Sequence, residues 1–168
     1  MNFKNLQSFM DDLNSENLTI AFAQSMTAGL LVNEFSKANG ASKVLKGSIV
    51  TYHPELKIRL LSVDPSTIAK YTPESQEVTT EMVKGLLKII FADIAIAVTG
   101  LASEVGSESE EKPVGTVFIS ILFQNNLFEF KTVFDFDGNN SVEERQKEIM
   151  NKTVDFVFNK LNELYYNK

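Results

Sequence analysis

The segment that most constrains the fold of this chain is LTIAFAQSMTAGLLVNEF, residues 18–35. It begins as an apolar run (18–23), turns through polar and small residues (24–29), and continues with apolar residues at helical spacing (30–35). This pattern is typical of a buried strand that leads into a helix, with the turn at the carboxyl end of the strand. Ligands of open α/β sheets bind at that end, where a helix also offers free N–H groups. The segment therefore predicts an α/β fold with a ligand site near residues 24–29.

Two hydroxyl side chains, Ser25 and Thr27, lie in this turn. Serine and threonine are favoured N-caps, so the simpler interpretation is that both only cap the following helix. The alternative is that one of them is a nucleophile at the end of the strand. The turn alone favours capping and leaves the second interpretation open.

Helices and strands alternate along the rest of the chain. Apolar residues at helical spacing predict a helix over residues 2–14, and short apolar runs predict strands at 46–52, 93–98 and 116–123. The start signals Pro54, Asp64-Pro65 and Thr72-Pro73-Glu74 predict two short helices and a longer one. The helix that begins near residue 30 is expected to end near Asn39-Gly40.

The end of the chain predicts a hairpin followed by a helix. Asn125-Asn126 is expected to turn the 116–123 strand back into a strand over 127–136, and Ser141 with Glu144 forms a capping box for the last helix. We therefore expect one domain over residues 1–168. Its predicted fold class is α/β, a three-layer α/β/α arrangement with a mixed, mostly parallel sheet and one hairpin.

Composition excludes several classes of function. The net charge is −6 and no block of Lys or Arg stands out, so we expect no nucleic-acid partner. The amino terminus is amphipathic and carries acidic residues, which predicts neither a signal peptide nor a membrane span. The chain has no cysteine and a single histidine, so a thiolate zinc site and a histidine metal cluster are excluded. A cytoplasmic location is expected.

Other candidate residues for chemistry follow predicted strands. Tyr52 and Thr99 stand at strand ends, and Lys57 follows Tyr52 by five residues. Such a set could perform acyl transfer, with a serine activated by a lysine whose pKa is lowered and with backbone N–H groups that stabilise the oxyanion. The residues alone favour another interpretation of Lys57, a solvated lysine on an exposed helix. His53 would have to serve any Ser-His-Asp triad, or it is a surface residue.

The segment 101–112 is a polar loop with four glutamates, Glu104, Glu108, Glu110 and Glu111. Carboxylates could bind a hard cation. A solvated, mobile loop is the more common reason for such a run of charge.

Four motifs fall in the order found in one family. They are Ala23-Gln24-Ser25-Met26-Thr27-Ala28-Gly29, Tyr52-His53-Pro54-Glu55-Leu56-Lys57, Ala97-Val98-Thr99-Gly100-Leu101-Ala102, and the intact Glu-Lys-Pro-Val-Gly-Thr-Val run at 111–117. With these motifs the chain resembles the nicotinamide-nucleotide amidases, the C-terminal domain of the competence/damage-inducible protein CinA. The resemblance extends over residues 15–160.

The resemblance implies hydrolysis of the carboxamide of nicotinamide mononucleotide to nicotinate mononucleotide and ammonia, a step of pyridine nucleotide salvage. It implies Ser25 as nucleophile, Lys57 as general base and Tyr52 as a residue that assists the serine. It also implies a substrate pocket formed by two groups of residues: Thr27, Ala28 and Gly29 at the helix start, and Thr99, Gly100 and Ala102 after the later strand. The resemblance implies no metal or cofactor. It does imply self-association into a homo-oligomer.

Several positions depart from the family pattern. Gln24, Met26 and Ala28 replace Glu, Cys and Gly, and His53-Pro54 replaces Ser-Asn. Ser103-Glu104-Val105 replaces a Gly-Pro segment, Gly138-Asn139-Asn140 lacks an arginine, and Glu144 stands at a second arginine position, next to Arg145. These changes leave two alternatives: a catalytically weakened paralogue that binds a nucleotide or a protein, and an amidase whose substrate lacks phosphate.

Overall fold

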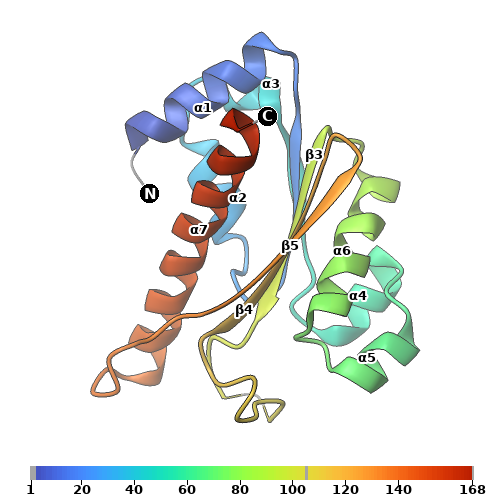
Figure 1. Cartoon of the computed structure of the whole chain (residues 1–168), viewed down its shortest axis with the longest axis vertical. Coiled ribbons are helices and arrows are strands. Elements are labelled where there is room, and N and C mark those ends of the chain that lie inside the picture. The colour runs from blue at the N-terminus through green and yellow to red at the C-terminus, as the bar shows by residue number, and fades with distance from the viewer. Residues whose placement is uncertain (1–2, 105, 168) are drawn as a thin grey trace.

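The computed structural model describes residues 3–104 and 106–167, which form one five-stranded sheet between two layers of helices (Figure 1). This confirms the predicted α/β fold class. Met1, Asn2, Val105 and Lys168 belong to the predicted domain but lie outside the described residues. The elements in chain order are α1 (Phe3–Ser15), β1 (Ile20–Gln24), α2 (Leu30–Ser36), α3 (Ala41–Val44), β2 (Leu45–Val50), α4 (Pro54–Leu61), α5 (Pro65–Tyr71), α6 (Gln76–Ile89), β3 (Ile94–Gly100), β4 (Thr116–Phe123), β5 (Asn126–Val133) and α7 (Val142–Tyr166).

The sheet has the strand order β2-β1-β3-β4-β5. β1 is parallel to both β2 and β3, whereas β4 is antiparallel to β3 and β5 is antiparallel to β4. β4 is thus the reversed strand, and the carboxyl ends of β1, β2 and β3 meet at one edge. The mixed sheet with one hairpin is the predicted arrangement, with two of its four strand pairings parallel and two antiparallel.

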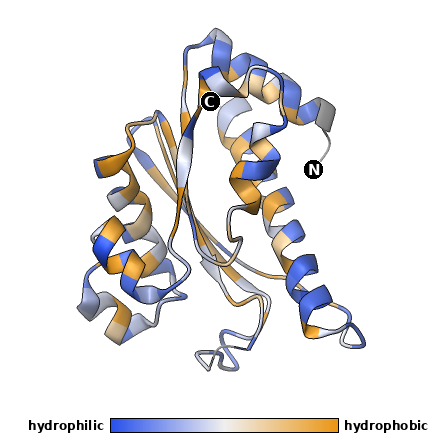
Figure 2. Cartoon of the chain, turned by 180° about the vertical axis from the view of Figure 1, so that it is seen from behind, coloured by the Kyte–Doolittle hydropathy of each residue, from blue (hydrophilic) through white to orange (hydrophobic). Residues whose placement is uncertain are grey.

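The two faces of the sheet carry side chains of different size. Ile20 and Phe22 of β1 belong to the large apolar core under α1, α2 and α7, whereas Ala21 and Ala23 face the smaller core under α6. Small residues on this second face let a helix approach the sheet closely. In Figure 2 the helices on both sides turn their apolar surfaces inward.

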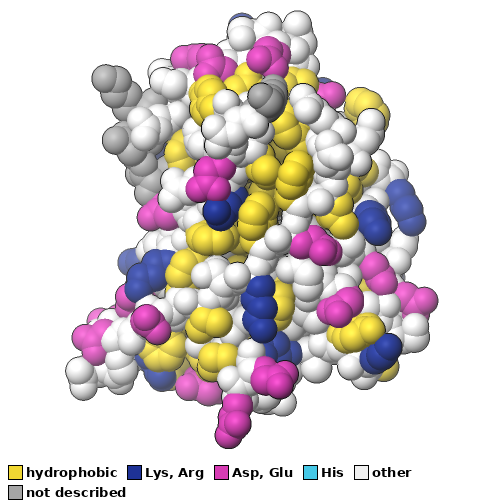
Figure 3. Space-filling model, in the orientation of Figure 1, with side chains coloured by type: hydrophobic (Ala, Val, Ile, Leu, Met, Phe, Trp, Pro, Cys, Tyr) yellow, Lys and Arg dark blue, Asp and Glu magenta, His cyan; other side chains and the backbone are white. Residues whose placement is uncertain are grey.

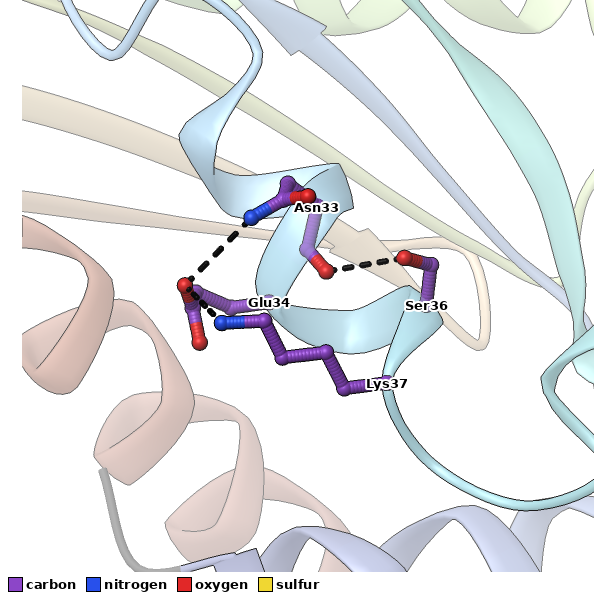
Figure 4. A network of polar contacts seen from close by, with 4 residues as sticks. All are labelled: Asn33, Glu34, Ser36 and Lys37. Carbon is purple, nitrogen blue, oxygen red and sulfur yellow. Dashed lines mark hydrogen bonds and ion pairs between the residues drawn. The ribbon is translucent and has the colours of Figure 1, made fainter.

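The outward face of α2 is held by local polar contacts (Figure 4). Lys37 Nζ lies 2.6 Å from Glu34 Oε1, and the Ser36 hydroxyl donates to the Asn33 carbonyl at 2.8 Å. The inward face of the same helix buries Leu31 and Phe35. α2 is therefore amphipathic and fixes the turn that precedes it against the core.

Most predicted helix starts are confirmed. His53 and Asp64 cap α4 and α5, each with a proline in the first turn, and Ser141 and Glu144 form the capping box of α7. The start predicted at Thr72-Pro73-Glu74 is wrong, because the N-cap of α6 is Ser75, whose hydroxyl accepts the Val78 N–H. Residues 72–74 instead form a turn between α5 and α6.

Two boundaries also differ from the prediction. The hairpin turns at Gln124-Asn125, one residue before the predicted Asn125-Asn126, with φ of 52° and 63° at the two residues. Positive φ at both central positions defines a type I′ turn, which matches the twist of a two-residue hairpin. The predicted helix end at Asn39-Gly40 is replaced by the earlier end of α2 and by α3, which Gly40 caps at φ 75°.

Apolar side chains gather in the upper middle of the face shown in Figure 3, between α7 and the edge strand β5, with Lys or Arg side chains beside and below them. Leu127 and Val133 of this strand are 37% and 46% exposed. Within residues 3–104 and 106–167, no helix is both long enough and apolar enough to cross a membrane.

Candidate active site

Ser25 lies at the common edge where three parallel strands end. The Ser25 N–H donates to the Val98 carbonyl of β3 at 3.0 Å, and the Thr51 N–H after β2 donates to the Gln24 carbonyl at 2.8 Å. Ser25 is therefore held between the ends of β2 and β3, as the strand–turn–helix pattern predicts.

The turn after β1 is organised by the buried side chain of Gln24. Its Oε1 atom accepts the Thr27 hydroxyl at 2.8 Å and the Leu31 N–H at 3.0 Å, and its Nε2 atom donates to the Ser48 hydroxyl. The Thr27 hydroxyl is thus used inside the turn. Gln24 forms these bonds without a charge, so the change from the family's glutamate is compatible with an ordered turn.

Neither hydroxyl of the turn caps α2. The N-cap is Gly29, at φ 98°, and it makes no side-chain cap hydrogen bond. The capping interpretation of Ser25 and Thr27 is therefore wrong. Ala28 has φ 48° and is exposed, so it occupies a left-handed conformation that favours the glycine found in the family.

Lys57 is 1% exposed, and the interpretation of it as a solvated lysine is wrong. Its Nζ atom donates to the Pro73 carbonyl at 2.6 Å and to the Thr99 hydroxyl at 2.8 Å. Burial lowers the pKa of Lys57 to about 8, the nearby Glu74 carboxylate opposes this, and the Lys112 ammonium adds to it. A lysine with such a pKa carries a useful fraction of neutral amine near physiological pH.

A small cavity of about 60 Å³ opens beside Ser25. Four of the predicted site residues line it, namely Ser25, Tyr52, Gly100 and Ala102. Tyr52 is 59% exposed at this site. Lys57 and Thr99 are buried and absent from the lining, and no hydrogen bond joins the Ser25 hydroxyl to a described residue.

Further residues that line the cavity were not predicted. They are Glu74 from the 72–74 turn, Gln146 from α7, Met26, and Ser103 from the 101–112 loop. Because Glu74 follows a proline, the sequence predicts it at the start of a helix and gives no sign that it lines the cavity. Gln146 comes from the last helix, whose packing over the sheet is set by tertiary contacts, and no local signal marks it.

The 101–112 loop is tied to the 72–74 turn. The Ser107 hydroxyl donates to Glu74 Oε2 at 2.7 Å, and Lys112 Nζ donates to the Glu74 carbonyl at 3.1 Å. Across the described residues, no group of three His, Cys, Asp or Glu side chains is arranged to hold a metal ion.

The remaining candidates have structural partners. His53 is exposed at the start of α4, where its Nδ1 atom accepts the Glu55 N–H at 3.3 Å. Glu144 takes part in the capping box, whereas Arg145 stacks over Phe136 and lies 3.7 Å from Glu104. The Glu104 carboxylate thus meets a positive charge on α7.

A larger groove of about 410 Å³ lies elsewhere, between the start of β3 and the β4–β5 turn, and includes Phe91 and Asp93. Its lining is mostly apolar, and Asp93 accepts hydrogen bonds from Thr19. The groove contains none of the predicted site residues, so the candidate active site is the smaller cavity at the strand ends.

Fold and site together define a three-layer α/β protein with a serine and a buried lysine at the carboxyl ends of its parallel strands. The family model described as "CinA C-terminal domain" matches residues 3–165. The chain belongs to this family.

Relatives and solved structures agree with this assignment. The chain is 43% identical to a CinA-like protein of Petrotoga mobilis over 80% of its own length and 44% identical to one of Prochlorococcus marinus over 68%. It spans about a third or less of these relatives, 34% and 27%. The crystal structure of the competence/damage inducible protein CihA from Agrobacterium tumefaciens superposes with a TM-score of 0.86 at 27% identity, covering 97% of this chain and 94% of that one.

Proposed function

We propose that this protein hydrolyses the carboxamide of nicotinamide mononucleotide to nicotinate mononucleotide and ammonia. Ser25 acts as the nucleophile and Lys57 as the general base. The observation that carries the proposal is the buried Lys57 amine, with a pKa lowered to about 8, at the strand ends that also hold Ser25. An amine buried in this way is expensive to maintain without a use.

The chemistry needs a neutral lysine and a free hydroxyl. The Ser25 hydroxyl attacks the carboxamide carbon while neutral Lys57 takes its proton. The resulting Lys57 ammonium then protonates the amide nitrogen of the tetrahedral intermediate, and the C–N bond breaks to release ammonia and leave the acyl-serine. The acyl-serine is hydrolysed by water with the same lysine as base. The Thr99 hydroxyl, which accepts a hydrogen bond from Lys57, holds the amine toward the end of β3.

A backbone donor is available for the oxyanion. Met26 lines the cavity next to Ser25, and its N–H makes no hydrogen bond to another described residue. A free N–H just after the nucleophile is well placed to stabilise the tetrahedral intermediate.

The size of the cavity sets which part of the substrate enters. A volume of about 60 Å³ suits a carboxamide, whereas ligand pockets that enclose whole small molecules have about 300 Å³ or more. The ribose phosphate therefore lies outside, near the exposed ring of Tyr52, which offers an apolar surface for the pyridine or the ribose.

A second candidate is an amidase whose substrate lacks phosphate. The observation that favours it is the acidic surroundings of the cavity. Glu74 lines the cavity, and Glu104 lies 3.7 Å from Arg145, the cation next to position 144, where the family pattern has an arginine. Carboxylates near the entrance oppose the binding of a phosphate.

Ammonia release from nicotinamide mononucleotide and from nicotinamide riboside tests both candidates. The proposal expects release from the mononucleotide by the wild type and at least a thousandfold less by Ser25→Ala, whose fold is checked by circular dichroism. Faster release from the riboside would favour the second candidate. No release from either, with a thermal shift by the mononucleotide, would indicate a binding module without catalysis.

A further inference from the structure

Lys112 ends the 101–112 loop, does not line the cavity and has no part in the chemistry above. Its Nζ atom donates to the Thr72 hydroxyl and to the Glu74 carbonyl. These two acceptors flank Pro73, so one ammonium group bonds the 72–74 turn on both sides of its central residue.

The Pro73 carbonyl is the group that holds the lysine base. It accepts Lys57 Nζ at 2.6 Å and the Thr99 hydroxyl at 3.3 Å, while Lys57 also donates to Thr99. The Pro73 carbonyl is thus one of two acceptors that hold the Lys57 amine, and it also accepts from the other one, Thr99.

The turn that carries the carbonyl needs an external restraint. Thr72 has φ 70° and ψ 160°, a conformation that a β-branched residue adopts only where its surroundings impose it. The Lys112 bond to the Thr72 hydroxyl is such a restraint. Lys112 is itself fixed, because its backbone N–H and carbonyl pair with Ser109 at 3.1 and 3.0 Å.

We infer that Lys112 is a positioning residue, which clamps the 72–74 turn so that the Pro73 carbonyl keeps the Lys57 amine beside Thr99. The geometric part of this role is independent of the reaction, whereas its effect on turnover rests on the proposed function. Separately from this geometric role, the Lys112 charge lowers the pKa of Lys57.

The test titrates Lys57 directly, by NMR of lysine labelled at Cε, with the Lys57 signal assigned by its loss in Lys57→Arg. Lys112→Met removes the clamp, and Lys112→Arg restores a cation with several donors. Lys131→Met is the matched control, because Lys131 also adjoins this region but bonds the Glu111 carbonyl instead of the turn.

We expect the Lys57 midpoint to rise by about half a unit or more in Lys112→Met, to stay near the wild-type value in Lys131→Met, and to be largely restored in Lys112→Arg. If Lys112→Met does not fold, Thr72→Val removes one acceptor of the clamp and keeps the Lys112 charge. Its midpoint is expected to fall, because a displaced Pro73 carbonyl no longer stabilises the Lys57 ammonium, and a midpoint equal to that of the wild type would contradict the clamp. A midpoint in Lys112→Met that is unchanged or lower, or no higher than in Lys131→Met, would overturn the inference.

Turnover gives a separate readout. If the wild type releases ammonia, Lys112→Met should be about threefold slower or more at pH 7.5, and the deficit should shrink above pH 9.5, where the amine is neutral in both proteins. If the wild type releases none, the proposed function fails, while the NMR titration still decides the role of Lys112.

Discussion

Lys57 is the residue in which burial and chemistry are most closely linked. It is 1% exposed, and its hydrogen-bond partners among the described residues are a carbonyl and a hydroxyl, so the nearby Glu74 carboxylate offsets the loss of solvation only in part. Desolvation therefore favours the neutral amine. The burial that suits Lys57 to the proposed role of general base also makes it a cost to the folded state.

This cost predicts how stability depends on pH. Below pH 8 Lys57 is charged in the folded and unfolded states, and between about 8 and 10.5 only the unfolded state keeps the proton. Since the unfolded state then binds more protons, the Lys57 contribution to the free energy of unfolding rises with pH over this window, by about 2–3 kcal/mol in total.

Urea denaturation of the wild type and of Lys57→Met, carried out from pH 7 to 10.5, gives the free energy of unfolding of each protein. The change with pH in the difference between these two free energies measures the Lys57 contribution. The wild type should gain stability relative to the variant as pH rises. The same comparison with Lys84→Met, an exposed position on α6, should show no such trend. A difference between wild type and Lys57→Met that stays constant with pH would refute the burial account.

At the scale of elements, the position of Lys57 depends on how α4 packs against α6. Gly85 of α6 lies at the crossing, and a Cβ atom built there would be 1.8 Å from the Leu61 carbonyl oxygen at the end of α4. Leu61 and Lys57 are the buried residues of α4. A side chain at position 85 must therefore move the helix that carries Lys57.

Gly85→Ala is expected to lower the free energy of unfolding by about 2 kcal/mol or more, because the clash involves backbone and cannot be relieved by a rotamer change. Gly138→Ala is the matched control, since nothing lies within 4 Å of its added Cβ atom, and it should be nearly neutral. Urea denaturation measures both. Equal stabilities of the two variants would contradict the close α4–α6 contact.

The sequence predicts elements well where the signals are local. The β1–turn–α2 segment, the caps of α4, α5 and α7, and the span of β4 all follow from periodicity and capping residues. The 72–74 turn does not, because Pro73 resembles a helix start, whereas its carbonyl accepts a hydrogen bond from Lys57, which lies 16 residues earlier on another helix.

At the scale of the whole molecule, the fold brings together residues that are distant along the chain. Ser25 follows β1, Lys57 belongs to α4, Thr99 ends β3, and Gln146 comes from α7. The parallel strands bring Ser25, Lys57 and Thr99 to one edge of the sheet. The positions of Ser25 and Thr99 at strand ends already follow from the apolar runs in the sequence. The burial of Lys57 and the positions of Glu74 and Gln146 at the cavity depend on tertiary packing. Local sequence patterns therefore could not predict them.

The most direct test of the account is a rapid-quench mass measurement of the intact protein during reaction with nicotinamide mononucleotide. The account predicts a transient acyl adduct that maps to the Ser25 peptide, is absent from Ser25→Ala, and accumulates faster as pH rises from 7 to 9 because more Lys57 is neutral. An adduct that maps to another peptide, or that forms equally in a folded Ser25→Ala variant, would contradict it.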